Sequence, residues 1–90
     1  MPRKELIKRV PGGKTLKVEM EIKDGKIASI VFSGDFFAYP PEKFEEMEKS
    51  LVSAGLDEIE EIIESFRDEV VVVGLSFDDI IMSLKELLRD

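Results

Sequence analysis

The segment Gly12-Gly13-Lys14-Thr15 combines residue types that bind phosphate, because glycine amides and a lysine ammonium can both contact an anion. A nucleotide-binding phosphate loop has a further glycine five residues before the glycine of its Gly-Lys pair, and that position here is Lys8. Such a loop also opens a helix, whereas Thr15 begins an alternating, strand-like segment. We therefore expect no nucleotide-cradling loop, and at most a contact between Lys14 and an anion held by another protein.

The remaining residues do not form a recognisable catalytic or metal-binding motif. The chain contains no His and no Cys, which excludes thiol catalysis, disulfides, cysteine-bound zinc and iron–sulfur sites, and the commonest general base. The acidic residues follow helical spacing beside apolar stripes, which is typical of solvated helix faces. They include Glu58, Glu60, Glu61, Glu64, Asp78 and Asp79. We expect no catalytic residue, no metal site and no two-carboxylate hydrolase in this chain.

Length and composition indicate one globular domain over residues 1–90, with 43% hydrophobic and 37% charged residues. No apolar run reaches the roughly 18 residues of a membrane span, and no long apolar stretch follows the N-terminus as in a secretory signal. We therefore expect a cytoplasmic protein without membrane contact. The absence of Asn, Gln and Trp, together with many Lys, Glu and Arg residues, fits a protein from a hot environment.

The charge is unevenly distributed. Residues 1–17 carry a net charge of +5, so the rest of the chain carries −12 of the total of −7. An acidic body repels phosphates, and we therefore expect no nucleic-acid partner. The basic N-terminal segment is explained either as a solvated strand or as a contact for an acidic partner or a phosphate.

The first third of the chain predicts three antiparallel strands. Residues 15–23 alternate strictly, with Leu16, Val18, Met20 and Ile22 on one face. The dipeptide Asp24-Gly25 favours a type I′ hairpin turn. The strand after it, from 26 to about 33, is expected to place Ala28, Ile30 and Phe32 on one face. A short strand over 5–10, with Leu6, Lys8 and Val10 on one side, precedes the turn that Pro11-Gly12 favours.

The remainder predicts three helices. Pro40-Pro41 opens the first, and Gly55 is expected to stop it. Asp57 and Glu60 have the spacing of a capping box for the second helix, as do Ser76 and Asp79 for the third. The apolar stripes of the three helices are Phe44, Met47, Leu51 and Ala54; Ile59, Ile62, Ile63 and Phe66; and Phe77, Ile80, Ile81, Leu84, Leu87 and Leu88.

Strands followed by helices indicate an α+β fold, in which a three-stranded antiparallel meander is followed by three helices packed on one face. The β-branched run Val70 to Val73 is consistent with a short strand or with a buried connector, and the sequence does not decide between them.

The connector Gly34-Asp35-Phe36-Phe37-Ala38-Tyr39-Pro40-Pro41 is the least ordinary segment, because it places two Phe and the only Tyr between a strand and a helix. Connectors are usually polar, so this one either closes an edge of the core or contacts a partner. One of the two Phe is expected to belong to the domain's own core, and the sequence does not say which.

Two segments in this order carry a resemblance to a known family: 8–14, which is Lys-Arg-Val-Pro-Gly-Gly-Lys, and 34–42, which runs from Gly-Asp-Phe-Phe to Pro-Pro-Glu. With the alternating strand, the Asp-Gly hairpin and the Gly74 to Asp79 entry to the last helix, the chain resembles the C-terminal accessory domain of lipoate–protein ligases. It is particularly similar to the separate small subunit of the bipartite, archaeal-type ligases. The catalytic domain of these ligases, with its triple-glycine loop and adenylating lysine motif, is not part of this sequence.

The resemblance implies an assisting role. Ligases of this family join lipoate to ATP, which gives lipoyl-AMP and pyrophosphate, and then pass the lipoyl group to a lysine of an acceptor domain. It implies that this chain is not active alone, that a large catalytic subunit is its partner, and that ATP, lipoate and Mg act through that partner. The alternative that we retain is a free-standing protein-interaction module unrelated to lipoylation.

We expect the partner to contact the turn from Pro11 to Lys14 and the loop from Gly34 to Tyr39. Glycines permit close backbone approach, an exposed Phe can anchor in a partner pocket, and Lys14 can face a phosphate or a carboxylate. The interface candidates are Pro11, Gly12, Gly13, Lys14, Gly34, Asp35, Phe36, Phe37 and Tyr39.

Overall fold

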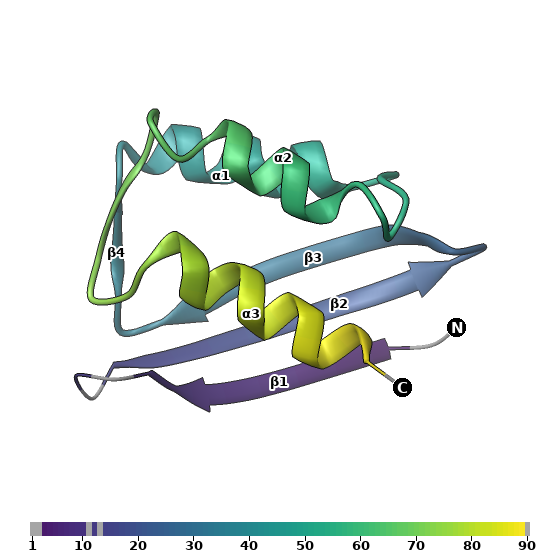
Figure 1. Ribbon diagram of the computed structural model, residues 1–90, viewed down its shortest axis with the longest axis horizontal. Coiled ribbons are helices and arrows are strands. Elements are labelled where there is room, and N and C mark those ends of the chain that lie inside the picture. Colours follow the sequence, from purple (N-terminus) through teal and green to yellow (C-terminus); the bar gives the residue numbers. More distant parts are fainter. Residues whose placement is uncertain (1–2, 11, 13, 90) are drawn as a thin grey trace.

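The computed structural model describes residues 3–10, 12 and 14–89. Within them the chain forms five strands and three helices (Figure 1). In chain order these are β1 Arg3–Arg9, β2 Thr15–Lys23, β3 Lys26–Gly34, β4 Phe37–Tyr39, α1 Pro41–Leu51, α2 Ile59–Ser65, β5 Val71–Val73 and α3 Phe77–Leu88. The α+β prediction of an antiparallel meander followed by three helices is confirmed, and the short strands β4 and β5 are added to it.

The meander is a three-stranded sheet of order β1-β2-β3, and both strand pairs are antiparallel. The alternation predicted for β2 is confirmed, because Leu16, Val18 and Met20 are buried and the residues between them are not. Asp24 and Gly25 both take positive φ values, 54° and 75°, as the predicted type I′ turn requires.

The predicted inward face of β3 is wrong at one position. Ile27 is buried and Ala28 is exposed, whereas Ile30 and Phe32 are buried as expected. The register explains the difference: Ile27 pairs with Ile22 and Ser29 pairs with Glu21, which leaves Ala28 as the extra residue of a β-bulge. A bulge shifts the alternation by one residue, so a strict period of two cannot locate it.

The helix interiors agree with the predicted stripes, but two of the predicted ends do not. Helix α1 ends at Leu51 rather than at Gly55, and Ser53 makes the turn after it with a φ of 73°. Helix α2 begins at Ile59 without a side-chain cap, so the Asp57–Glu60 capping box is wrong.

The carboxylate of Glu58 accepts a hydrogen bond from the Gly55 N–H at 2.8 Å, which ties the loop before α2 together instead. The capping box of α3 is confirmed. The Ser76 hydroxyl accepts a hydrogen bond from the Asp79 N–H, and the Asp79 carboxylate accepts one from the Ser76 N–H.

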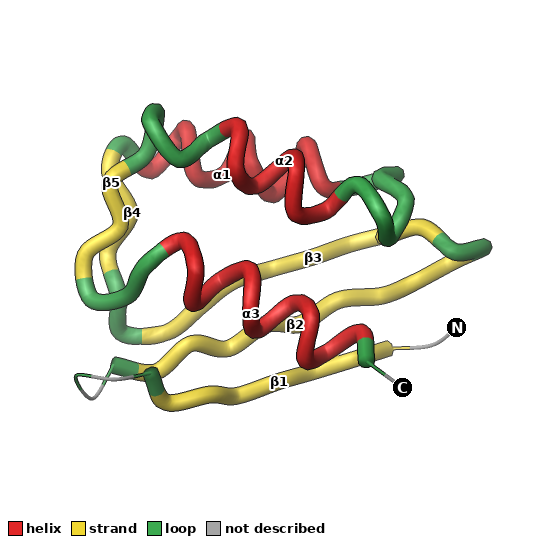
Figure 2. Tube along the Cα trace, in the orientation of Figure 1, coloured by secondary structure: helices red, strands yellow, loops and turns green. Residues whose placement is uncertain are grey.

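The three helices lie on one face of the sheet (Figure 1). Buried residues from the strands and the helices form one hydrophobic core. Strands β4 and β5 form a separate antiparallel pair at one end of the molecule, where they connect the sheet layer to the helix layer (Figure 2). The open question about Val70 to Val73 is thereby answered. Val70 is a buried connector residue, and Val71–Val73 is a strand.

Candidate partner-binding surface

The β4–β5 pair exposes one of its two faces. Phe37 lies opposite Val73 and Tyr39 lies opposite Val71, and these four side chains point to the same side because residues alternate along a strand. Their exposed fractions are 74% for Phe37, 72% for Tyr39, 64% for Val71 and 56% for Val73. We call these four side chains the apolar face.

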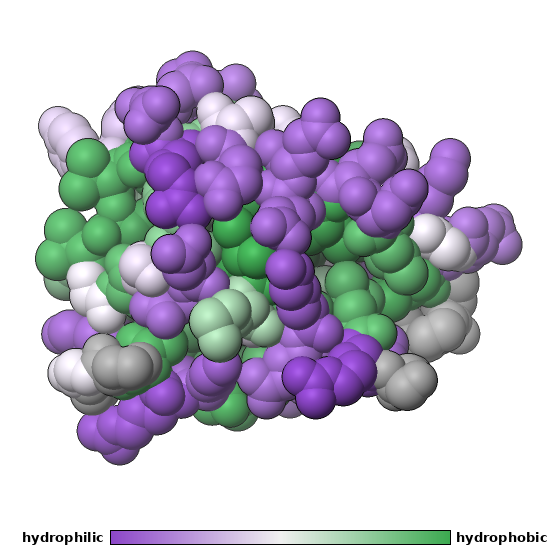
Figure 3. All heavy atoms as spheres, viewed as in Figure 1, coloured by the Kyte–Doolittle hydropathy of each residue, from purple (hydrophilic) through white to green (hydrophobic). Residues whose placement is uncertain are grey.

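The other side of the β4–β5 pair faces inward. Ala38 and Val72 lie opposite each other in the register and pack, partly buried, against the core. Figure 3 shows apolar side chains gathered at the end of the molecule where Figure 1 places β4. An exposed cluster of large apolar side chains marks an interaction surface more often than a solvated one.

The structure separates the two phenylalanines. Phe36 is partly buried, and its ring contacts the ring of Phe44 edge to face at a centroid distance of 5.8 Å. Phe44 makes a similar contact with Phe32, also at 5.8 Å, so Phe36 ends a row of aromatic rings that closes the core. Phe37 has no part in that row and points to solvent. Phe36 is thus the core residue of the pair, and Phe37 is the one free to contact a partner.

Lys14 lies against Gly74, the residue that follows β5, because Gly74 has no side chain to displace it. Gly74 follows β5 with a φ of 108°, and a Cβ atom built on it would lie 3.1 Å from Lys14 Cγ and 3.4 Å from Phe36 Cβ. The aliphatic part of Lys14 therefore passes over Gly74, at the end of the pair where Phe37 and Val73 meet. In the part of the chain that the structure describes, its ammonium makes no ion pair within 4.0 Å, so it can face an acidic group of a partner.

Gly34, the last residue of β3, and Asp35, which follows it, pack against the backbone of Thr15 at the start of β2. Asp35 Oδ1 accepts a hydrogen bond from the Thr15 N–H at 2.6 Å, and the Asp35 N–H donates to the Thr15 carbonyl at 3.3 Å. Gly34 has a φ of 145°, and a Cβ atom there would overlap the same carbonyl. Both residues therefore fix where the apolar face is placed.

The turn before β2 is described in part. Gly12 is exposed with a φ of 98°, and a Cβ atom on it would have nothing within 4 Å. The Val10 N–H donates to the Lys14 carbonyl at 2.8 Å and closes the turn. Pro11 and Gly13, two of the predicted interface residues, lie outside the described residues.

Sequence reasoning missed two members of the apolar face, Val71 and Val73. They belong to a β-branched run that becomes a half-exposed strand only because β4 pairs with it, and β4 is three residues long. The available signal was the alternation of Phe37, Ala38 and Tyr39, which matches a strand that exposes every second residue.

Three ionisable groups with shifted pKa values, Glu64, Arg67 and Lys43, belong to ion pairs away from the apolar face. A hydrogen bond from Arg67 lowers the pKa of Glu64, and hydrogen bonds to Glu64 and Asp78 raise the pKa of Arg67. A hydrogen bond to Glu69, with the charge of nearby Glu46, raises the pKa of Lys43.

These are ion pairs at the surface of the helix layer, with N–O distances of 2.6 Å for Arg67–Glu64 and 3.1 Å for Lys43–Glu69. Among the described residues, no group of three or more potential metal ligands gathers. The chemistry that the structure offers at the apolar face is contact and desolvation.

Comparison with known proteins identifies the family to which this chain belongs. The family described as the bacterial lipoate protein ligase C-terminus matches residues 3–84. The chain belongs to this family. The resemblance drawn from the two glycine-containing segments is confirmed.

Two relatives, both from Thermoplasma acidophilum, extend the comparison. "Lipoate-protein ligase A subunit 2" is 28% identical over 71 residues, which cover 78% of this chain and 76% of the relative. A solved structure of an archaeal lipoylation system, described as a bi-partite lipoate protein ligase and its E2 lipoyl domain, matches with a TM-score of 0.77 and 27% identity over 93% of each chain.

None of the helices within residues 3–89 is long and apolar enough to cross a membrane.

Proposed function

We propose that this chain is the small, non-catalytic subunit of a bipartite lipoate–protein ligase. With the large catalytic subunit it supports the ATP-dependent activation of lipoate to lipoyl-AMP, before the lipoyl group is transferred to lipoyl domains. ATP, lipoate and Mg are held by the large subunit. The family match over residues 3–84 and the similarity to a ligase subunit support this role.

The observation that carries the proposal is the apolar face. Four large apolar side chains stay exposed on a short two-stranded sheet of a chain whose other apolar residues largely fill a core. Aromatic anchors at the centre of an interface contribute most of its binding energy, and Phe37 and Tyr39 are exposed aromatic residues of this kind. We assign the apolar face as the main contact with the large subunit and Lys14 as a charged contact at its margin.

The physical role of such a subunit is to cover the active-site cleft of the catalytic subunit. A mixed anhydride such as lipoyl-AMP is hydrolysed by water, and a small rigid cap over the cleft excludes water and strengthens electrostatic interactions with the phosphates. A cap needs no nucleophile of its own, which agrees with a chain that contains no His and no Cys. The cap then has to open, because the acceptor lysine arrives on a protein domain.

Reconstitution of the two subunits tests the proposal. The large catalytic subunit of a bipartite lipoate–protein ligase is incubated with ATP, Mg and lipoate, with and without this chain, and pyrophosphate and lipoyl-AMP are measured. We expect adenylate to form at an appreciable rate only when both subunits are present. Equal rates with and without this chain contradict the proposal. Equal rates together with no complex between the two subunits favour the alternative of an interaction module unrelated to lipoylation.

A further inference from the structure

Strand β3 is an edge of the three-stranded sheet, and one stretch of that edge is open. The Phe32 N–H points away from β2, because it donates a hydrogen bond to Glu48 Oε2 at 2.8 Å. In an antiparallel strand the backbone groups of every second residue point the same way. The N–H and C=O of Ile30, two residues earlier in a regular stretch of the register, therefore also point outward.

The chain itself closes the edge on both sides of Ile30. At Ile27 the loop after α1 adds a short bridge, in which the Ile27 N–H donates to the Ala54 carbonyl at 3.3 Å and the Ser53 N–H donates to the Ile27 carbonyl at 2.7 Å. At Phe32 the Glu48 carboxylate takes the outward N–H. Within the described residues, no group meets the outward N–H and C=O of Ile30. Unpaired edge groups of this kind are a template for pairing with another chain.

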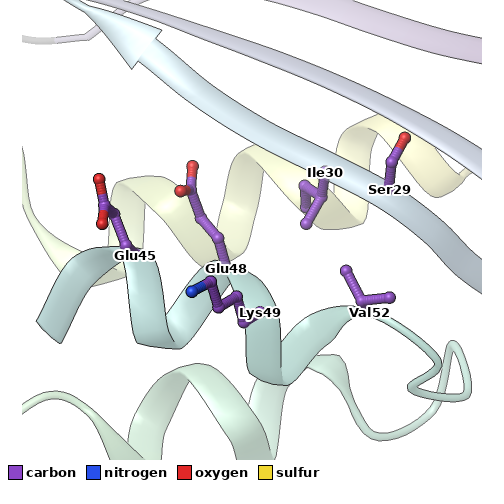
Figure 4. A pocket seen from close by; sticks show the side chains of 6 residues that line it. All are labelled: Ser29, Ile30, Glu45, Glu48, Lys49 and Val52. Carbon is purple, nitrogen blue, oxygen red and sulfur yellow. The ribbon is translucent and has the colours of Figure 1, made fainter. Parts of the chain in front are cut away.

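A groove follows this open stretch. It has a volume of about 420 Å³ and is lined by Ser29, Ile30, Glu45, Glu48, Lys49 and Val52 (Figure 4). The side chains of Glu45 and Glu48 both extend from α1 toward β3 in Figure 4. A second hollow of about 330 Å³ shares these two glutamates and continues along β3 to Gly34.

The groove carries more negative than positive charge. Neither Glu45 nor Glu48 makes an ion pair within the described part of the chain, and Lys49 is the one cation among the residues that line the groove. Partial burial raises the pKa of Glu48, against the opposing effect of the Phe32 N–H, and the nearby charge of Glu45 raises it further. A cation from another molecule would relieve this unfavourable environment.

We propose that an extended segment of the catalytic subunit pairs with the open edge of β3 at Ile30 and places a lysine or arginine against Glu45 and Glu48. The bridge at Ile27 shows that this edge accepts a two-bond pairing. A second copy of this chain suits the groove less, because two β3 edges would bring their own glutamates together. The inference rests on the proposed function, since it takes the catalytic subunit as the partner.

Amide hydrogen exchange at Ile30 tests the pairing. The ¹⁵N-labelled chain is compared by NMR alone and in complex with the catalytic subunit, and the exchange rate of the Ile30 amide is measured. We expect exchange at Ile30 to slow by at least about tenfold in the complex. Unchanged exchange at Ile30 in a complex that supports lipoyl-AMP formation overturns the edge pairing and leaves the proposed function intact. Failure to form any complex overturns both.

Charge reversal on α1 tests the basic residue of the partner. Glu45→Lys changes an exposed residue, and we expect it to weaken the complex by at least about tenfold and to reduce the protection at Ile30. Glu61→Lys, on the exposed side of α2, is the matched control and is expected to change neither quantity. Equal effects of the two variants contradict a specific cation at the groove. Protection at Ile30 that rises with the concentration of the isolated chain assigns the edge to a second copy and overturns the proposal.

Discussion

In the part of the chain that the structure describes, two sheet faces are exposed, and they are built from different residues. The face of the three-stranded sheet opposite the helices, here called the outer face, carries ion pairs across its strands, with Arg3–Glu19 at 2.7 Å and Lys17–Glu5 at 3.9 Å. The apolar face of the β4–β5 pair carries four aromatic or β-branched side chains. Both faces contact water in the isolated chain, but only the outer face carries the charged side chains that are typical of a solvated surface.

The outer face also has exposed apolar residues, but these are isolated from one another, unlike the residues of the apolar face. Ile7 and Val31 are 63% and 51% exposed, but they lie on β1 and β3, and the charged residues Lys17 and Glu19 of β2 lie between them. Single apolar residues among charges are ordinary on a protein surface. Apolar residues that are contiguous across two paired strands are not, and this difference separates a solvated face from a binding face.

The largest expected effect is at the junction between the two sheets. Gly34→Ala places a Cβ atom against the Thr15 carbonyl at a φ of 145°, and we expect it to lower the free energy of unfolding by about 3 kcal/mol or more. Gly25→Ala is the control, because its φ is also positive but nothing lies within 4 Å; we expect a loss of about 1 kcal/mol. Denaturant unfolding measures both, and equal losses would show that the junction is not tightly packed.

The second prediction compares the loss of stability on replacing Phe36, which packs on the core, with that on replacing Phe37, which is exposed. Phe36→Ala removes a ring that packs on Phe44, and we expect it to lower the free energy of unfolding by about 2 kcal/mol, below the range for fully buried Phe. Phe37→Ala removes an exposed ring and is expected to change the same quantity by less than about 0.5 kcal/mol. Thermal and denaturant unfolding provide the measurement. A larger loss for Phe37 than for Phe36 would reverse the assignment of the two residues.

The smallest effect concerns the carboxylate that closes the edge of β3. Burial raises the pKa of Glu48 above its ordinary value of 4.5, so the folded chain holds a proton that the unfolded chain has lost within that window. The contribution of Glu48 to the stability of the wild type therefore falls as the pH rises from 4.5 through the raised pKa. Glu48→Gln does not titrate and its side-chain oxygen still accepts the Phe32 N–H, so we expect its stability relative to wild type to increase across that window and then level off.

Unfolding at several pH values measures this difference, with Glu61→Gln as an exposed control that is expected to show no such trend. A wild type that gains stability relative to Glu48→Gln as the pH rises would show that the hydrogen bond from Phe32 outweighs burial at this carboxylate.

Much of the fold follows from local sequence patterns. The alternation in β2, the two positive φ values at Asp24-Gly25 and the capping box at Ser76 and Asp79 are each set by neighbouring residues, and each was predicted. The bulge at Ala28 was not, because it depends on how β3 pairs with β2. The start of α2 was also missed, because Glu58 bonds to Gly55 instead of a capping box forming at Asp57.

The candidate partner surface was also predicted only in part from the sequence. The position and aromatic character of the loop from Gly34 to Tyr39 indicated a partner surface, and the structure brings Lys14, Phe37 and Tyr39 to one end of the molecule. Which Phe faces outward depends on the packing of Phe36 against a helix that begins later in the chain. Val71 and Val73 join the face only through pairing with β4; the alternation of residues 37–39 indicates a strand but not which segment pairs with it.

The central claim is that the apolar face, and not the outer face, binds the catalytic subunit. Isothermal titration calorimetry of that subunit with the wild type, Phe37→Ala and Ile7→Ala compares one exposed apolar residue from each face. We expect Phe37→Ala to raise Kd by about 30-fold, which corresponds to about 2 kcal/mol, and Ile7→Ala to change it by less than about twofold. An unchanged Kd for a folded Phe37→Ala protein, or a larger increase for Ile7→Ala, would contradict the account.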